Sequence, residues 1–463
     1  MELFLSIIDF LWNNIMVEVM VVLALWFTIK TKAVQITMFP EMLRTLKGTT
    51  QKQSGEGKSI SSVEAFLISL ASRVGVGNLA GVALAITIGG PGAIFWMWIM
   101  AILNAATSFV ESTLAQLYKS RDGNFFIGGP AYYINKGLKS RSLAIVVAIL
   151  SVLTFSFIIC SVQSNTIAIS GEEAFGISPI WSAIIIGVLM SLTIFGGVER
   201  VAKVTSMLVP LMAFAYILVV VCIVLANINQ IPAIFSLIVD SAFGIKQVAA
   251  GGVGMAIMMG VKRGLFSNEA GMGSAPNAAA TADVKHPINQ GFVQAMGVFV
   301  DTLIICSCTA FLIFIGGADA LADLEGIALT QYALSSKTGE WAYHFIAIII
   351  FFFGFSTCLS NSYYGEANIR FIKDNDTLVN IFRVLMILIV MAGAVIPLDV
   401  VWAMADLFMI FIVLINMLSI TKLGNKVYML LNDYKAQRQQ GIKTPLFKKS
   451  NIKELDTPDI ECW

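Results

Sequence analysis

Long apolar segments separated by short polar ones run along almost the whole chain. Most are about 20 residues long, the length of α-helix that crosses the hydrocarbon core of a bilayer. The segments at 142–160 and 205–225 are apolar on every helical face, whereas strands of a transmembrane barrel alternate apolar and polar positions. The pattern predicts eleven helical spans, at 15–30, 62–88, 94–118, 142–163, 178–197, 204–226, 246–282, 290–316, 341–369, 377–397 and 399–421.

Composition agrees with this pattern and excludes two broad classes of protein. Hydrophobic residues make up 57% of the 463 positions and charged residues 13%, about half the charged share of a soluble domain. A soluble enzyme is therefore excluded, and a net charge of +1 gives no field that would hold nucleic acid. We predict an all-α, multi-pass protein of the cell inner membrane, surrounded by lipid bilayer, with no obligate protein partner.

Basic residues gather on one side of the predicted spans. They are concentrated in 30–58, 119–141 and 422–453, while the opposite loops carry Glu172, Glu173 and Glu325. Because short loops rich in Lys and Arg stay on the cytoplasmic side, this asymmetry predicts an N-terminus outside the cell and a cytoplasmic C-terminus.

The spans divide the chain into four parts. Residues 1–61 hold an N-terminal transmembrane helix and a cytoplasmic loop, residues 62–226 a first set of five spans, and residues 246–421 a second set. Residues 422–463 form a polar cytoplasmic tail. For this tail we favour a flexible, solubilising extension over a regulatory element.

Two of the spans contain sequences that disfavour a continuous helix. The second contains ASRVGVGNLAGVA at 71–83, and the seventh contains GVKRGLFSNEAGMGSAPNAAA at 260–280. Each glycine in a helix interior costs about 1 kcal/mol relative to alanine. Close helix packing explains glycines, but it does not explain Arg73, Asn78 and Glu269 at membrane depth, where a charge is expensive. We therefore expect both helices to be interrupted, one within 71–81 and the other within 262–273.

The two interrupted spans lie five positions apart in the order of spans. Discontinuous helices at matching positions of two halves are typical of secondary transporters, which bind substrate near the middle of the membrane. Unpaired N–H groups suit a carboxylate, and unwound carbonyls suit a cation. A membrane-embedded enzyme is disfavoured because no nucleophile–base or metal motif is present, and a channel is disfavoured because no filter sequence is present.

At these motifs the sequence resembles the alanine-or-glycine:cation symporter family, also called the sodium:alanine symporter family. The resemblance covers essentially the whole chain and rests on VGVGNLAGVALAITIGGPGAIFWMW at 74–98, GGPAYYI at 128–134, GVKRGLFSNEAGMGSA at 260–275 and YYGEANIRF at 363–371. It implies a leucine-transporter-like fold, with two inverted repeats of five helices, one extra N-terminal helix and eleven transmembrane helices in all. It also implies import of a small neutral amino acid with a co-transported sodium ion, by alternating access.

The resemblance assigns substrate contacts to several elements. The break in the second span would contribute its main chain, and Asn78 would shape the turn or add an oxygen. Gln163 matches a glutamine that faces the substrate in the family, although hydrogen bonding between helices explains it equally well from the residue alone. The full set implied for substrate is Gly75, Val76, Gly77, Asn78, Gln163, Phe266, Ser267, Asn268 and Asn361.

The resemblance also implies a sodium site between the first break and the ninth span. Carbonyl oxygens of Ala71, Val74 and Phe353 would join the hydroxyls of Ser356 and Thr357. Oxygen ligands without a fixed charge suit a monovalent ion that must bind and leave. Without the break opposite, the two hydroxyls would instead be read as bonded to their own helix.

Asn361 departs from the family pattern, because many members have tryptophan there. A tryptophan would bound the space over a small side chain, whereas Asn361 widens it or offers hydrogen bonds. Alanine and glycine remain the first substrates, with D-alanine, serine and glutamine as alternatives. Proton coupling in place of sodium coupling also stays open.

Several charges lie within the predicted spans. For Glu111 we favour an ion pair with Arg73 or with a basic residue of the seventh span over a role in coupling. Lys262 and Arg263 are alternatively expected to pair with Glu111 or Glu269. Two further carboxylates, Asp301 and Asp406, are expected in structural pairs, with a proton path as the alternative. Near the end of the ninth span, Glu366 and Arg370 have the spacing of a helical ion pair. For His286 no carboxylate partner is predicted.

Overall fold

The computed structural model describes residues 2–48, 60–123, 125–245, 252–316 and 324–463. The described residues are almost entirely helical, apart from one short antiparallel hairpin of β1 (Ser120–Asp122) and β2 (Phe125–Ile127). Part of the basic loop at 30–58 and the first residues of the predicted second repeat, 246–251, lie outside the described residues.

The helices up to residue 226 include all six predicted spans, together with α3, α4 and α8, which the spans did not anticipate. The first helix begins at Glu2 and α10 continues to Phe175, both beyond the predicted bounds. α1, α2 and the π-helical turn between them form one long N-terminal helix, and a π-helical stretch at Val152–Ile159 joins α9 to α10. The bounds are α1 (Glu2–Leu11), α2 (Val17–Lys30), α3 (Val34–Thr37), α4 (Phe39–Gly48), α5 (Ser62–Arg73), α6 (Ala80–Gly89), α7 (Gly92–Leu117), α8 (Pro130–Gly137), α9 (Arg141–Ser151), α10 (Cys160–Phe175), α11 (Pro179–Ile194) and α12 (Gly197–Ala226).

The helices after residue 226 include two that the spans did not anticipate, α13 and α18. A second π-helical stretch at Phe299–Cys306 joins α16 to α17. The bounds are α13 (Ile231–Ala242), α14 (Gly252–Asn268), α15 (Ala275–Thr281), α16 (Pro287–Val298), α17 (Ser307–Gly316), α18 (Gly326–Thr338), α19 (Trp341–Ile372), α20 (Asp376–Gly393) and α21 (Leu398–Gln439).

Within the described residues, eight helices are long and apolar enough to cross a membrane, or nine if the bent pair of α5 and α6 is one span. The molecule is therefore an all-α polytopic membrane protein, and the predicted count of eleven is not confirmed. One reason is that α11 is only 16 residues long. The predicted seventh span is likewise divided into two short helices, α14 and α15.

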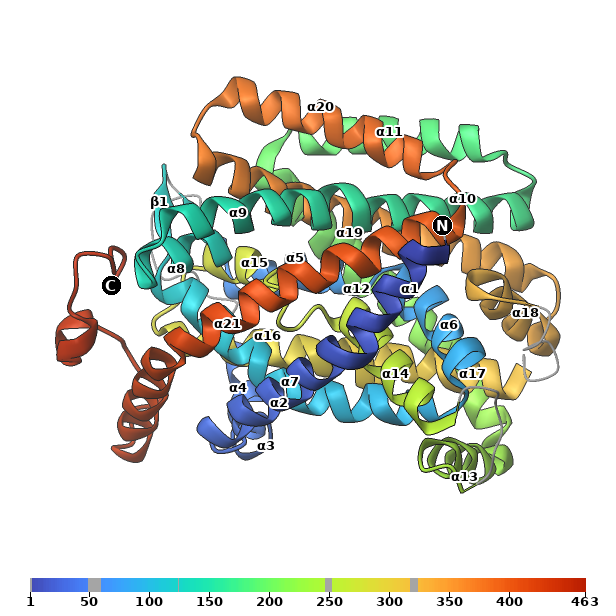
Figure 1. The fold of residues 1–463 in the computed structure, drawn as a ribbon, viewed down its shortest axis with the longest axis horizontal. Helices are drawn as coiled ribbons and strands as arrows, with labels where there is room; N and C mark the ends of the chain where they lie inside the picture. The colour runs from blue at the N-terminus through green and yellow to red at the C-terminus, as the bar shows by residue number, and fades with distance from the viewer. Residues whose placement is uncertain (1, 49–59, 124, 246–251, 317–323) are drawn as a thin grey trace.

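The helices pack into two main groups. In the α7 group, α7 packs against α6, α14, α15 and α16; in the α19 group, α19 packs against α9, α10 and α20. Figure 1 shows α9 and α20 on one side of the molecule and α7 and α14 on the other, with the long helix α21 crossing between them. α5 contacts members of both groups and therefore lies between them.

The tail is ordered, which corrects the prediction of a flexible extension. α21 continues past the predicted span to Gln439, and the residues after it fold back onto the bundle. Phe447, Leu455 and Ile460 are buried. These widely spaced apolar side chains join the main hydrophobic core of the bundle, a capacity that the average composition of the tail hides.

Candidate substrate and cation site

The first interruption lies where the sequence predicts it. α5 ends at Arg73, a single 3-10 turn spans Val76–Asn78, and the two helical pieces meet at an angle of 57°. A Cβ atom on Gly75 would lie 2.7 Å from Thr357 Oγ1 and 2.8 Å from Gln163 Oε1. Glycine is thus needed here because α10 and α19 approach the backbone too closely for any side chain.

Gln163 and Asn78 bind the N–H groups that the interruption exposes. The Gln163 Oε1 atom accepts a hydrogen bond from the Val76 N–H at 2.9 Å, and Asn78 Oδ1 accepts one from the Gly75 N–H at 2.9 Å. The structure therefore places Gln163 against the break through a hydrogen bond between helices, the alternative that the residue by itself offers. It also places on Val76 an N–H donor of the kind that binds a carboxylate.

The second interruption lies between α14 and α15, at 269–274. Glu269, Gly271 and Gly273 have positive φ angles of 56°, 89° and 83°, a conformation that ends a helix. The Glu111 carboxylate accepts hydrogen bonds from the Gly271 N–H at 3.0 Å and the Gly273 N–H at 3.2 Å. Glu111 therefore binds the unwound backbone, which corrects the predicted ion pair with Arg73 or a basic residue.

Phe266, Ser267 and Asn268 occupy the last turn of α14. The resemblance matches them to the break of the seventh span, and the structure corrects this because the unwound segment begins after them. The interruption begins one residue later because Glu269 is the first residue with positive φ. Phe266 still meets the first break, since a Cβ atom on Gly77 would lie 2.8 Å from its ring. The Asn268 side chain points to Thr302, whose Oγ1 accepts from its Nδ2 at 3.3 Å.

Asp301 joins the two interrupted helices. Its carboxylate accepts from Asn78 Nδ2 at 2.6 Å and from the Ser267 hydroxyl at 2.7 Å. All three side chains are buried. Asn78 and Ser267 thus bind the two different oxygens of one carboxylate, which links the two helices.

Oxygen atoms converge on the Thr357 hydroxyl of α19. Thr357 Oγ1 lies 2.9 Å from the Ala71 carbonyl oxygen and 3.0 Å from that of Phe353. The Ser356 hydroxyl also lies 3.0 Å from the Phe353 oxygen. One hydroxyl has a single proton and cannot saturate two carbonyls, so the cluster is rich in acceptors, as a sodium site requires. Val74, whose carbonyl was the other predicted ligand, is the residue that follows the last residue of α5, and its N–H donates to the Leu70 carbonyl.

Asn361 is fully buried and incompletely bonded. Its Oδ1 atom lies 2.9 Å from the Ser72 hydroxyl, which is also 2.8 Å from a Glu269 oxygen. The Asn361 Nδ2 group has no hydrogen-bond partner among the described residues. The Ser72 hydroxyl has one proton for two acceptors, so one polar atom of the buried Asn361 amide is left to pair with a polar ligand group.

Lys262 and Arg263 pair with Asp406 of α21, which corrects the predicted partners Glu111 and Glu269. Lys262 Nζ lies 2.7 Å from an Asp406 oxygen, and the Arg263 guanidinium binds both oxygens at 3.1 and 3.2 Å. All three side chains are buried, so each charge depends on the others. The expected structural pairing of Asp406 is confirmed, with partners that the sequence did not identify.

Arg73 also differs from its predicted role. Its guanidinium donates to the Gln294 carbonyl at 2.8 Å and to the Ser108 hydroxyl at 3.0 Å. It thereby ties α5 to the α7 group through uncharged acceptors. His286 has a carboxylate partner that was not predicted, because its Nε2 atom lies 3.2 Å from Asp433 Oδ2.

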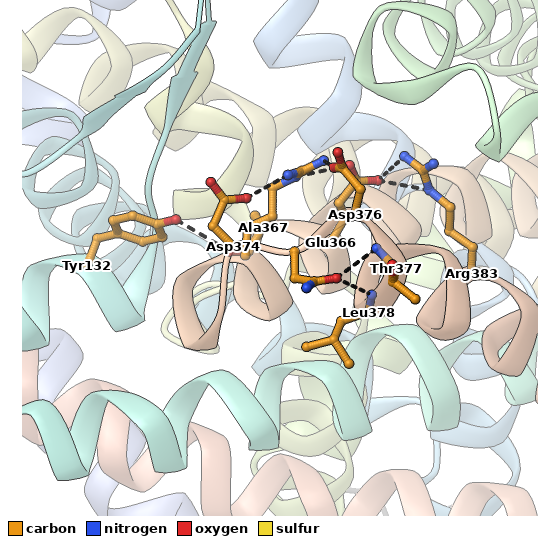
Figure 2. Close-up of polar contacts among 10 residues, drawn as sticks. Tyr132, Glu366, Ala367, Asp374, Asp376, Thr377, Leu378 and Arg383 are labelled. Atoms are coloured by element: carbon orange, nitrogen blue, oxygen red, sulfur yellow. Dashed lines mark hydrogen bonds and ion pairs between the residues drawn. The ribbon is translucent and has the colours of Figure 1, made fainter.

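An ion-pair network lies at the end of α19, where this helix meets α20. The predicted contact between Glu366 and Arg370 is confirmed at 3.5 Å, and Figure 2 shows Arg383 of α20 bound to the same carboxylate, at 2.6 Å. Asp374 and Asp376 complete the network around Arg370, at 2.7 and 2.9 Å. This network ties α19 to α20.

Three residues that contact the site were not predicted as ligands: Ser72, Asp301 and Trp402. An intramembrane carboxylate such as Asp301 is itself a signal of function. Ser72 stands out only as a polar residue beside the glycines. Trp402, whose ring centroid lies 4.6 Å from that of Phe266, gives no signal because aromatic residues are common in apolar helices.

Two solved structures with a similar fold are distant from this chain in sequence. A mutant manganese transporter from Eremococcus coleocola superposes with a TM-score of 0.53 at 13% identity, covering 80% of both chains. A Na+-coupled sialic acid symporter in a substrate-bound, outward-open state gives 0.52 at 12% identity, covering 81% of this chain and 82% of that one. These likenesses show the leucine-transporter-like fold.

Relatives in sequence are much closer. The amino-acid carrier protein AlsT of Bacillus subtilis is 50% identical over 98% of this chain and 96% of its own. The probable sodium/glutamine symporter GlnT of the same species is 46% identical over 98% of this chain and 94% of its own. A sodium/proton-dependent alanine carrier protein of a Bacillus species is 36% identical over 87% and 93%. A model of the sodium:alanine symporter family matches residues 1–449, and the chain belongs to that family.

Proposed function

We propose that the chain imports a small neutral amino acid together with sodium, by alternating access around the two interrupted helices. Its family makes it a cation-coupled amino-acid symporter and a membrane transporter, not an enzyme. No bond of the substrate is made or broken in this function. The residues therefore act only by binding, orienting and releasing the two cargoes.

One observation carries the proposal: the Thr357 hydroxyl and the Gln163 carboxamide both meet the first break at Gly75. On one side of this glycine lie the acceptor-rich oxygens of Ala71 and Phe353, which suit sodium. On the other side lies the Val76 N–H, which suits the substrate carboxylate. A cation and an anion bound this close to one another stabilise each other, which is a physical basis for coupled transport.

The architecture that we propose has eleven spans, in two inverted repeats of five after one N-terminal helix. Such a repeat places the breaks of α5–α6 and α14–α15 in corresponding positions, and both approach Asp301. The excess of basic residues in the loops supports an N-terminus outside the cell and a cytoplasmic C-terminus.

Alanine and glycine are the substrates that we propose first, with D-alanine and serine as close alternatives. Glutamine is a second candidate, supported by the unpartnered Asn361 Nδ2 donor and by the name of the relative GlnT. A buried donor of this kind favours a substrate with a polar side chain over one with a methyl group. Proton coupling is the alternative to sodium, supported by the name of the sodium/proton-dependent relative.

Uptake into proteoliposomes tests this function. Purified protein is reconstituted, and labelled alanine, glycine and glutamine are supplied with an inward gradient of sodium, protons or neither. We expect saturable uptake driven by the sodium gradient, because one charge moving inward gains about 2.3 kcal/mol per 100 mV. Uptake that follows the proton gradient alone would favour the proton-coupled alternative. Uptake of none of these amino acids would contradict the proposed substrate class.

A further inference from the structure

The C-terminal segment, residues 447–463, lies across one end of the bundle. Phe447 donates its backbone N–H to the Lys285 carbonyl at 2.9 Å. Its ring packs on those of Trp463 and His286, with centroids 5.6 Å apart in both cases. The start of the segment is therefore packed against Lys285 and His286, and its last residue packs on its start.

Trp463 is bound to the end of α7. Its indole Nε1 donates to the Gln116 carbonyl at 3.0 Å, and the Lys119 ammonium lies 4.7 Å from its ring centroid. The Cys462 thiol donates to the Lys119 carbonyl at 3.4 Å. Burial lowers the pKa of the Lys119 ammonium to about 7.

Two acidic residues of the segment bind a second pair of lysines. Lys136 Nζ lies 3.0 Å from Glu461 Oε1, and Lys139 pairs with Asp459. Lys136 belongs to α8, and Lys139 follows it directly. The surface that receives the segment therefore consists of Gln116, Lys119, Lys136, Lys139 and Lys285, and it fits an acidic peptide with an aromatic residue.

This surface joins the two packing groups of helices. Gln116 and Lys119 lie at the end of α7, in the α7 group. α8 packs mainly against α9 and also contacts α7, and its Tyr132 hydroxyl donates to the Ala367 carbonyl of α19 at 3.5 Å, as Figure 2 shows. Arg141 at the start of α9 donates to the Phe371 carbonyl of α19 at 2.9 Å. Through α9, Tyr132 and Arg141, Lys136 and Lys139 are linked to the α19 group, while Lys136 Nζ also donates to the Ser120 hydroxyl beyond α7 at 2.7 Å.

We propose that the surface of Gln116, Lys119, Lys136, Lys139 and Lys285 is a peptide-binding site, which the C-terminal segment occupies in cis to restrain transport. The segment bridges the α7 and α19 groups, so relative movement of the groups at this end has to break its contacts. The family match ends at residue 449, before Glu461 and Trp463, so membership in the family does not assign these contacts. The proposal concerns regulation and holds whichever amino acid is carried.

A charge reversal in the full-length chain tests this site. Glu461→Lys places two positive charges together, and the double variant Glu461→Lys with Lys136→Glu restores an opposite pair. Glu454→Lys makes the same change at an exposed position of the same segment and serves as the matched control. Trp463→Ala, which removes the contact with Gln116, is a second and independent disruption.

Two readouts separate binding of the segment from its effect. Thiol labelling of Cys462 in purified protein, resolved by peptide mass, reports exposure of the segment without depending on transport. Sodium-driven uptake in proteoliposomes reports restraint. For Glu461→Lys and Trp463→Ala we expect labelling and the maximal uptake rate to rise about two- to fivefold, the scale of one partly exposed ion pair. We expect the double variant and Glu454→Lys to stay near wild type.

Two results would overturn the proposal. If Cys462 labelling in Glu461→Lys and Trp463→Ala matches wild type, the segment does not occupy the site in solution. If labelling rises while the uptake rate is unchanged or falls, the segment binds but does not restrain transport.

Discussion

Gln163 Oε1 of α10 lies 2.9 Å from the backbone nitrogen of Val76, in the turn that interrupts the second predicted span. The same carboxamide would lie within 3.2 Å of a Cβ atom on Gly75 through both of its polar atoms. Gln163 therefore presents an acceptor to the break and a donor beside it. In the function that we propose, a substrate carboxylate bound to the Val76 N–H would take the place of the Gln163 oxygen and meet the Gln163 amide group.

Replacing Gln163 with leucine removes both polar atoms while keeping similar volume. We expect the KM for substrate to rise about tenfold, because a lost hydrogen bond to a charged group costs about 1.5 kcal/mol. The measurement is the concentration dependence of uptake in proteoliposomes. Gln331→Leu is the control, since Gln331 bonds to carbonyls of Ser170 and Tyr343 elsewhere in the molecule. An unchanged KM in Gln163→Leu would show that this side chain does not contact substrate.

A single methyl group at Gly75 should disrupt the site with little effect elsewhere. The new Cβ atom would lie 2.7 Å from Thr357 Oγ1 and 2.8 Å from Gln163 Oε1, and relief of such overlap costs about 1–3 kcal/mol. We expect Gly75→Ala to lower kcat/KM at least about tenfold while the protein stays monodisperse in detergent. The control is Gly254→Ala, where a Cβ atom meets nothing within 4 Å. Equal uptake by both variants would contradict the close approach.

The neighbouring hydroxyls of Ser356 and Thr357 offer a matched pair for the sodium site. Thr357 reaches across to the Ala71 carbonyl, whereas the nearest carbonyl to the Ser356 hydroxyl is that of Phe353 on its own helix. We expect Thr357→Ala to raise the sodium concentration for half-maximal uptake about tenfold, Ser356→Ala to raise it less, and the double variant to raise it most. Sodium titration of uptake at saturating substrate measures this. Unchanged sodium dependence in the double variant would remove the proposed cation site.

Substrate range should respond to the residue at 361. A bulky ring in Asn361→Trp should narrow the range toward glycine and alanine, because Asn361 is already fully buried. Asn361→Leu keeps the volume and removes the unpartnered donor, so we expect competition by glutamine to weaken at least about tenfold relative to alanine. Competition against labelled alanine measures both variants. An unaltered competition profile in Asn361→Leu would show that this residue does not contact substrate.

The second interruption should depend on the two acceptor oxygens of the Glu111 side chain. In Glu111→Gln one of the two oxygens that accept from Gly271 and Gly273 becomes a donor, leaving one N–H unpaired. We expect a loss of about 1–3 kcal/mol in stability, seen as a lower melting temperature in detergent, together with slower uptake. Glu340→Gln, at an exposed position before α19, is the control. A melting temperature equal to that of the control would show that Glu111 does not hold the unwound segment.

Much of the fold followed from local physics that the sequence displays. Apolar runs predict membrane helices because a backbone surrounded by lipid has to form its hydrogen bonds within its own segment. Most predicted boundaries agree with the observed helices to within several residues. The break near Gly75 was predictable because glycines and Asn78 disfavour a helix on their own. The second break was predicted in the right region, but its start at Glu269 depends on Glu111, which is distant in the chain.

The partners of charged and polar groups were decided by the tertiary structure alone. Lys262 and Arg263 find Asp406 in place of Glu111, because α21 rather than α7 presents a carboxylate beside them. The order of the tail has the same cause. Trp463 bonds to Gln116 of α7 and Glu461 pairs with Lys136 of α8, and neither contact can be read from the composition of the tail. Hydropathy and helix propensity depend on neighbours along the chain, whereas ion pairs and packed termini depend on which helices the bundle brings together.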